Sequence, residues 1–201
     1  MRRTLFLFAA IAAIFFPFLM PAQAQERVFD PVSKTWVKYY VSRDAAAKIA
    51  KRKYRRREVR YSGGEEPGTI IVDTDNRTLT YVLPHGRAMR YGIGVGREGF
   101  TWEGREKVTR KAKWPGWTPP AEMRVREAKA GRKIPAYMPG GEDNPLGARA
   151  LYLGNTIYRI HGTNENWSIG RQVSSGCIRM FNEDVIDLYQ RVKVGSPVVV
   201  H

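Results

Sequence analysis

The chain has 201 residues, and its 34 lysines and arginines against 19 aspartates and glutamates give a formal net charge of +15. This length allows one domain with a hydrophobic core and leaves little room for a second full domain. A single cysteine, Cys177, excludes an intramolecular disulfide.

The N-terminal segment predicts an export leader. Two arginines precede an apolar run over residues 5–19, and the Ala-Gln-Ala of residues 22–24 has the small-x-small form of a cleavage site. We therefore predict a signal peptide over residues 1–24 and a mature chain that starts at Gln25. The alternative is an uncleaved membrane anchor, but the run is shorter than the roughly 20 residues of a spanning helix, and prolines interrupt its end.

The positive charge favours polyanionic partners. Removal of the leader takes Arg2 and Arg3 with it and leaves +13 on the mature chain. Outside the cytoplasm nucleic acid is a poor candidate partner, whereas anionic lipid headgroups, wall polymers and the carboxylates of peptidoglycan stems are present there. The alternative is that the charge only aids solubility.

Residues 25–67 are polar and basic, with too few apolar residues to bury much surface. Asp44 is a candidate cap for a short helix over residues 45–57. We predict an extended or partly helical N-terminal arm, which the glycine-rich residues 62–68 link to the rest of the chain.

Residues 68–201 read as one mainly β domain. Short strand-like runs alternate with turn residues, and Asn182 is placed to cap a helix whose first turn is acidic. This helix is the one we predict in the C-terminal half. The predicted strands are 69–72, 78–83, 88–95, 107–114, 150–153, 156–161 and 197–200.

Cys177 is the first candidate for chemistry. A lone cysteine in an exported chain is buried and inert, paired with another chain, or kept for its reactivity. A catalytic cysteine needs a base and a local field that favours the thiolate. Ser174-Ser175-Gly176 precede it, and consecutive backbone N–H groups after small residues can point toward one oxyanion. Arg179 is placed to add positive potential or to bind a carboxylate, although it also fits a solvated arginine on a strand.

His161 is the candidate base. His85 falls in a predicted turn, and His201 stands at the last position of the sequence. Strand alternation puts Arg159 and His161 on one face, so His161 lies beside a charge and not in an apolar row. A core histidine remains the alternative. We find no spacing of His, Cys, Asp and Glu typical of a metal site and no phosphate-binding glycine loop, so we predict no metal and no cofactor.

Two stretches together resemble a known family. Ile160-His161-Gly162-Thr163, followed after a short gap by Ser174 to Met180 and by Asn182, is similar to the signature of the L,D-transpeptidase catalytic domain, also called the YkuD family. The resemblance extends from about Gly68 to His201. It implies a mixed β-sandwich-like domain with the cysteine in a cleft between sheets, located in the periplasm or at the cell wall.

The resemblance also implies residue roles. Cys177 would be the nucleophile, His161 the base, and the Gly162 carbonyl the group that orients the imidazole. The substrate and oxyanion positions around the nucleophile would be Ser174, Ser175, Gly176 and Arg179. Ser175 departs from the pattern, because many members carry a second histidine there, which puts substrate contacts at that position in doubt.

The implied reaction is acyl transfer on peptidoglycan stem peptides. The cysteine would attack the diaminopimelate carbonyl of a tetrapeptide stem, release D-alanine, and pass the acyl group to an amine of another stem or of an outer-membrane protein. Two alternatives stay open. Water could resolve the acyl-enzyme, as in an L,D-carboxypeptidase or a hydrolase of wall-anchored proteins, or the domain could be a non-catalytic peptidoglycan-binding module.

Overall fold

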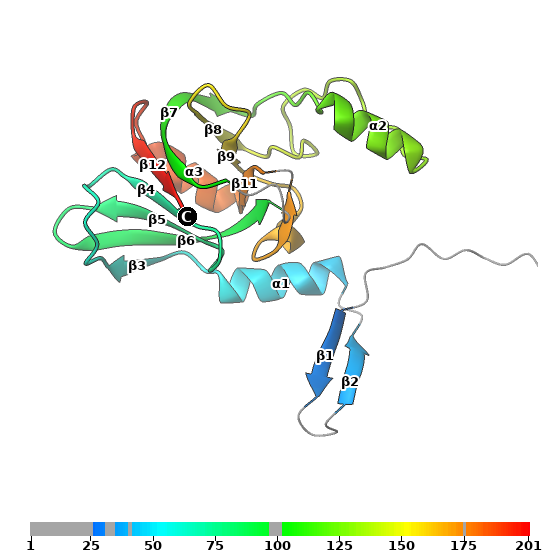
Figure 1. The fold of residues 1–201 in the computed structure, drawn as a ribbon, viewed down its shortest axis with the longest axis horizontal. Coiled ribbons are helices and arrows are strands. Elements are labelled where there is room, and N and C mark those ends of the chain that lie inside the picture. Colours follow the sequence, from blue (N-terminus) through cyan, green and yellow to red (C-terminus); the bar gives the residue numbers. More distant parts are fainter. Residues whose placement is uncertain (1–25, 31–34, 40–41, 97–101, 175) are drawn as a thin grey trace, which may run out of the picture. The chain divides into compact units, whose positions relative to one another are not determined.

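The computed structural model describes residues 26–30, 35–39, 42–96, 102–174 and 176–201 (Figure 1). The predicted signal peptide and Ser175 lie outside the described residues. The chain divides into two compact units, residues 1–40 and 41–201. In the first, β1 (Glu26–Asp30) pairs antiparallel with β2 (Thr35–Tyr39).

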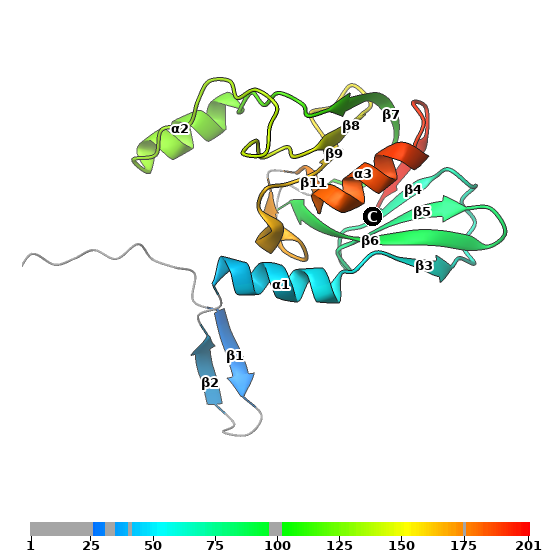
Figure 2. The ribbon, with the colours of Figure 1, turned by 180° about the vertical axis from the view of Figure 1, so that it is seen from behind.

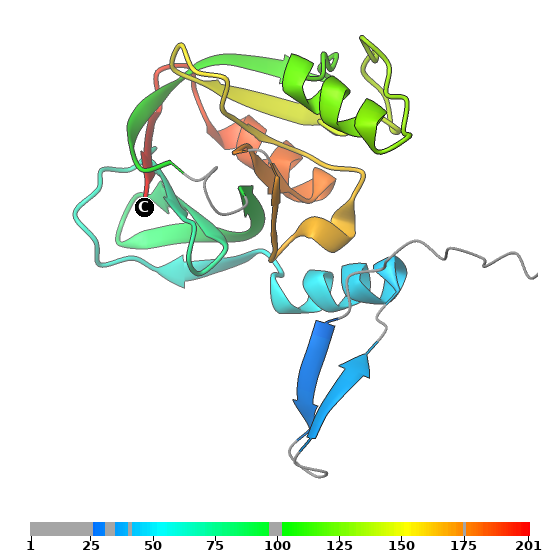
Figure 3. The same cartoon turned by 45° about the vertical axis from the view of Figure 1, so that its right-hand side comes forward.

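The second unit is built on one large, strongly curved sheet. Its strands run in the order β6-β11-β9-β8-β7-β12-β4-β5, and β5 pairs back onto β6, so these strands close into a ring. Strand β3 pairs with the N-terminal part of β6, and β10 pairs with the C-terminal end of β6. Figure 3 shows how the sheet curves around the core. The bounds are β3 (Arg57–Arg60), β4 (Ile70–Asp73), β5 (Thr78–Leu83), β6 (Arg87–Gly96), β7 (Gly104–Lys113), β8 (Arg149–Leu153), β9 (Arg159–His161), β10 (Gln172–Ser174), β11 (Ile178–Met180) and β12 (Pro197–Val200).

The core fills the inside of this ring. Alternate residues of the ring strands point inward, and several of them, such as Tyr91 and Ile93 of β6, are fully buried. Helix α3 (Asn182–Arg191) lies across the strands in Figure 2 and packs Val185 and Leu188 into the same core. The residues between them, such as Arg90 and Gly92, therefore belong to the outer face of the ring.

The predicted fold class, a mainly β, sandwich-like domain, is confirmed. All seven predicted strands are present, although β9 begins at Arg159 because the residues before it form a turn. The predicted short helix of residues 45–57 is present as α1 (Arg43–Lys53), which starts and ends earlier than predicted. Within residues 42–201 the structure adds β3, β10, β11 and one further α-helix, α2 (Ala121–Lys129). The added strands have three or four residues each, too few for alternation to be visible in the sequence.

Two predicted helix caps are wrong. Helix α1 is capped by Ser42, whose Oγ accepts a hydrogen bond from the Ala45 N–H at 3.2 Å, and Asp44 lies in its first turn. Helix α3 has Phe181 at its N-cap position without a side-chain bond. Asn182 is its first residue, and its Oδ1 accepts from the Ala148 N–H at 2.9 Å instead.

Helix α1 and strand β3 fall in the predicted arm but pack against the domain. Ala50 of α1 and the adjacent Tyr54 form a small cluster with Ile169 and Phe181, and β3 pairs antiparallel with β6. The predicted domain boundary at residue 67 stays a prediction. Within the described part of the chain, none of the helices is both long and apolar enough to cross a membrane.

Candidate active site

Two short parallel strands bring the predicted catalytic residues together. Strand β11 pairs with β9 in a register that matches Arg179 with His161 and Ile178 with Ile160. Both isoleucines are buried in the core, so His161 and Arg179 face outward. Cys177 directly precedes β11, and strand alternation assigns it to the same outer face.

His161 is nearly enclosed, with 4% of its surface exposed. Its Nδ1 lies 2.5 Å from the carbonyl oxygen of Gly162, which accepts the hydrogen bond of an Nδ1–H tautomer and leaves Nε2 unprotonated. Burial lowers the pKa of His161 to about 3, and the charges of Arg179 and Arg159 act in the same direction. The imidazole is therefore neutral at neutral pH and free to accept a proton.

Cys177 is half-buried beside β9. Its Sγ lies 3.9 Å from the carbonyl oxygen of Ile157, a distance at which a thiol S–H donates a weak hydrogen bond. Burial raises the pKa of the thiol, while the positive charges of Arg159 and Arg179 oppose that rise. The resting site thus pairs a neutral thiol with a neutral imidazole, and not a thiolate with an imidazolium.

The turn before the nucleophile is held by Ser174. Its buried hydroxyl donates to the Cys177 carbonyl at 2.6 Å and accepts from the Gly176 N–H at 3.2 Å. Gly176 has a φ of 101°, a left-handed conformation that only glycine adopts readily. The roles of Ser174 and Gly176 toward an oxyanion stay predictions, and in the resting turn the Gly176 amide is bonded to Ser174.

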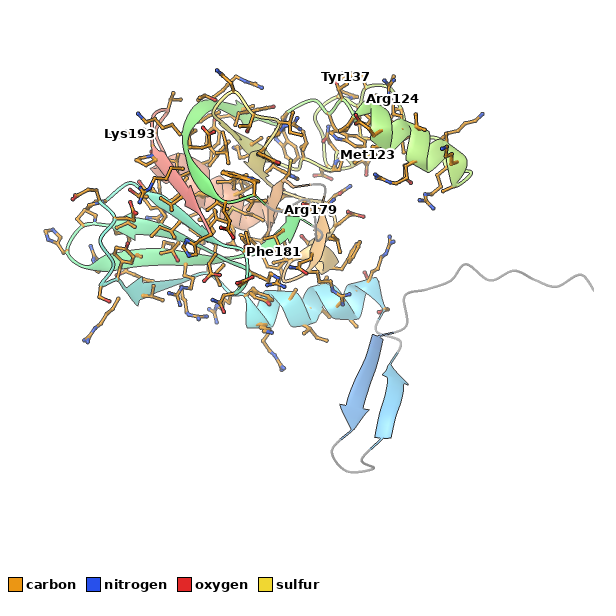
Figure 4. The ribbon with its side chains drawn as sticks, in the orientation of Figure 1. Met123, Arg124, Tyr137, Arg179, Phe181 and Lys193 are labelled. Atoms are coloured by element: carbon orange, nitrogen blue, oxygen red, sulfur yellow. The ribbon has the colours of Figure 1, made fainter. Side chains whose placement is uncertain are left out.

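Two arginines flank the pair. Arg179, which Figure 4 labels beside β11, has its Nη1 2.7 Å from Glu165 Oε2, so one carboxylate anchors it. The Nε atoms of Arg179 and Arg159 are buried without a hydrogen-bond partner among the described residues. Strand alternation predicts Arg159 on the same face as His161 but indicates no role for it. Its effect on the pKa of both Cys177 and His161 makes it part of the site.

The surroundings of Gly162 leave no room for a side chain. A Cβ at Gly162 would overlap Asn182 Oδ1 and lie 3.1 Å from the Ala148 nitrogen. The Gly162 N–H donates to the Arg149 carbonyl at 3.0 Å. Asn182 thus holds the loop before β8 against Gly162, whose carbonyl orients His161. The sequence predicts Asn182 as a helix cap instead.

The described residues include no group of three or more His, Cys, Asp and Glu side chains arranged to hold a metal ion. The described side chains of this site include a thiol and a neutral imidazole, which β9 and the residue before β11 carry on the outer side of a closed, mainly β domain.

A sequence model of the L,D-transpeptidase catalytic domain, YkuD, matches residues 67–200. The chain therefore belongs to the L,D-transpeptidase catalytic domain family. The probable L,D-transpeptidase YbiS of Escherichia coli strain K12 is 41% identical over 135 residues, which are 65% of this chain and 43% of that protein. The match thus spans less than half the length of that relative.

Two solved structures extend the comparison. One from Brucella melitensis, described as a probable carnitine operon oxidoreductase, is 44% identical, covers 77% of this chain and 99% of its own, and has a TM-score of 0.50. The catalytic domain of the Enterococcus faecium L,D-transpeptidase is 21% identical, with coverage of 69% and 100% and a TM-score of 0.52. The second likeness supports the fold alone.

Proposed function

We propose that this protein is a cysteine acyltransferase that acts on the peptide stems of peptidoglycan, as a periplasmic or wall-associated L,D-transpeptidase. The observation that carries the proposal is the parallel register of β9 and β11, which assigns Cys177 and His161 to one outer face in a chain of this family. The leader over residues 1–24 and the basic arm over residues 25–67 belong to the same proposal: the leader directs export, and the arm contacts an anionic surface.

The first half-reaction forms a thioester. Nε2 of His161 takes the thiol proton while Sγ of Cys177 attacks the diaminopimelate carbonyl of a tetrapeptide stem. Backbone N–H groups of the turn before Cys177 stabilise the oxyanion. When the intermediate collapses, the amide bond to D-alanine breaks, and the imidazolium returns its proton to the leaving amine. The acyl group stays on sulfur.

The second half-reaction releases the acyl group. An acceptor amine gives a proton to Nε2 of His161 as it attacks the thioester carbonyl, and the expelled sulfur is reprotonated. The acceptor is the side-chain amine of another stem, which gives a direct crosslink, or an amine of an outer-membrane protein. If water is the acceptor, the product is a trimmed stem and the protein is a carboxypeptidase or an anchor hydrolase.

The flanking arginines suit the charge of such a substrate. A tetrapeptide stem carries several free carboxylates, and guanidinium groups bind carboxylates through two parallel hydrogen bonds. Arg159 has a buried Nε with no partner in the described structure, and Arg179 has another beside its contact with Glu165. We assign both arginines to holding the donor stem.

The test is mass spectrometry of the intact protein after incubation with a disaccharide-tetrapeptide, for wild type and Cys177→Ala, with analysis of the released products. We expect a covalent adduct on wild type alone, with free D-alanine and crosslinked dimers. Adduct and D-alanine without dimers would favour water or a protein as acceptor. Folded wild type that gives neither adduct nor D-alanine would refute the proposal and favour a non-catalytic binding module.

A further inference from the structure

A hollow of about 550 Å³ lies on the outer face of the sheet, away from Cys177. Its floor comes from β3, β4, β5 and β6, and its wall from the C-terminal end of helix α1. We call it the β6 groove. Its lining includes Lys53, Tyr54, Arg57, Asp73, Thr80 and Arg90.

The strand register places two positive charges side by side on the floor of the groove. Arg57 of β3 is directly opposite Arg90 of β6, and Arg90 is opposite Thr80 of β5 on its other side. Like charges that face each other across antiparallel strands destabilise a sheet. We therefore expect that a bound anion would stabilise this pair of arginines.

Among the described residues, neither Arg57 nor Arg90 has an ion-pair partner, and the Nε of Arg90 is buried without an acceptor. Asp73 also lines the groove as an anion, but its two oxygens accept the backbone and side-chain N–H groups of Asn76 at 2.8 and 2.7 Å and form no ion pair with either arginine. By contrast Arg56, the neighbour of Arg57 in sequence, lies 3.4 Å from Asp187.

Close packing of Tyr54 fixes the wall of the groove. Tyr54 packs directly onto Gly92 and Gly170, at both of which a Cβ would overlap the tyrosine. Lys53 adds a third cation, with its Nζ 5.3 Å from the centre of the Tyr54 ring. The groove thus combines cations, aromatic edges and hydroxyls, a lining that suits an acidic peptide attached to sugar.

The groove and Arg179 lie on the outer side of the ring and adjoin the same strand, β6. Along β6, Arg90, Gly92 and Gly94 point outward, and Gly94 pairs with Arg179 of β11. A Cβ on Gly94 would lie 3.6 Å from the Cβ of Arg179, which confirms that the two residues are on the same side. Four residues of strand separate Arg90 from Gly94, a distance of about 14 Å.

We propose that the β6 groove binds a carboxylate-bearing stem peptide of the wall polymer, as a second site beside the one that holds the reacting stem. The identity of this ligand rests on the proposed function. Arg57 and Arg90 bind its carboxylate groups, and the bound anion removes the repulsion between them. The groove then docks the enzyme on the polymer through the outer side of β6, the strand that also pairs with Arg179.

The test is co-sedimentation with purified sacculi in the Cys177→Ala background, which prevents turnover. Adding Arg57→Gln and Arg90→Gln is expected to weaken binding about tenfold or more, as for loss of hydrogen bonds to charged groups. The matched control adds Arg60→Gln and Arg87→Gln. It removes the same two charges from the same two strands, where Arg87 already pairs with Glu58 at 3.2 Å.

An equal loss of sacculus binding for both pairs of substitutions, or no loss for either pair, would refute the proposal that the groove binds a stem peptide. Arg57→Gln alone, at an exposed side chain, repeats the test should the double variant fold poorly, and is expected to weaken sacculus binding in the same direction. Vesicles containing phosphatidylglycerol form a second arm. Loss of vesicle binding on changing Arg57 and Arg90, with sacculus binding intact, would contradict the choice of a stem peptide as ligand.

A separate assay of D-alanine release by wild type distinguishes this inference from the proposed function. If wild type releases D-alanine while sacculus binding does not depend on Arg57 and Arg90, the proposed groove site is refuted and the transpeptidase proposal stands. Groove-dependent sacculus binding without any release would support the groove as a wall-binding site and refute the catalytic proposal.

Discussion

Acidification is expected to destabilise the folded protein through His161. The pKa of this buried imidazole is about 3 in the folded state, against 6.5 for a free histidine. Between these values the unfolded chain binds a proton that the folded chain does not, so the free energy of unfolding falls as the pH falls. From pH 6.5 to pH 4 the loss amounts to about 3 kcal/mol. That is a large part of the roughly 5–15 kcal/mol that stabilises a typical domain.

A second buried group has the opposite effect. Burial raises the pKa of Asp184 to about 6 from 3.8, so the folded chain keeps a proton that the unfolded chain has lost. Its contribution to stability therefore grows as the pH falls from about 6 toward 4, by about 2 kcal/mol. The two effects offset each other in large part in wild type, which leaves a net loss of about 1 kcal/mol. A pH curve of wild type alone would not reveal either of them.

The assay is urea unfolding of wild type, His161→Gln and Asp184→Asn at several values between pH 4 and 7. For each protein we compare the unfolding free energy at pH 4 with its own value at pH 6.5. This change is expected to be about 3 kcal/mol more favourable for His161→Gln than for wild type, because only the aspartate effect remains. Asp184→Asn should deviate by about 2 kcal/mol in the opposite direction. Comparing slopes removes any constant cost of either substitution.

Two outcomes would refute this reasoning. Parallel curves for wild type and His161→Gln would mean that the imidazole titrates alike in the folded and unfolded chains. A curve on which wild type gains stability over His161→Gln toward low pH would mean a raised pKa for His161. A raised pKa is the mark of a resting thiolate and imidazolium pair, which would contradict the neutral pair described above.

Three further predictions concern single residues. Arg159→Gln is expected to lower kcat/KM for the tetrapeptide by about tenfold or more with little change in the unfolding midpoint, measured by D-alanine release and urea unfolding. Asn144→Ala should cost about 3 kcal/mol in unfolding free energy, because the buried Asn144 amide bonds the carbonyls of three residues at 2.9 to 3.2 Å. Gly94→Ala should lower the unfolding free energy by about 1–3 kcal/mol in urea, because its Cβ would lie 2.6 Å from the Ser168 carbonyl oxygen. An unchanged unfolding free energy for Asn144→Ala or for Gly94→Ala would contradict the packing described.

The longer strands could be predicted from the sequence because each carries its own alternation. Strand β5 begins and ends at the predicted residues, and β6, β7 and β8 differ from prediction by one to three residues. Strands β10 and β11 have three residues each and owe their extended form to pairing with β6 and β9. A pattern of period two cannot be recognised in three residues, so these strands were missed.

The place of His161 on the outer strand face could be predicted, but its supports could not, and the catalytic roles of His161 and Cys177 stay predictions. A lone cysteine and a histidine on a polar strand face follow from residue types and alternation. The bond from the Ala148 N–H to Asn182 joins positions 34 apart in sequence, and local reasoning assigned Asn182 to a cap. The opposed charges of Arg57 and Arg90 likewise depend on a strand register that appears only in the folded sheet.

The charges of Arg159 and Arg179 act on both members of the proposed catalytic pair, in addition to the larger effect of burial. Arg159 and Arg179 favour a thiolate at Cys177 but oppose the imidazolium that His161 becomes when it takes the proton. A substrate carboxylate that binds these arginines cancels the opposition and raises the basicity of His161. We therefore expect a tetrapeptide with amidated free carboxylates to acylate at least about tenfold more slowly at saturation, measured as the rate of adduct formation by mass. If amidation raised only the concentration needed for saturation and left that maximal rate unchanged, the carboxylates would serve binding alone, and the arginines would have no part in activating the base.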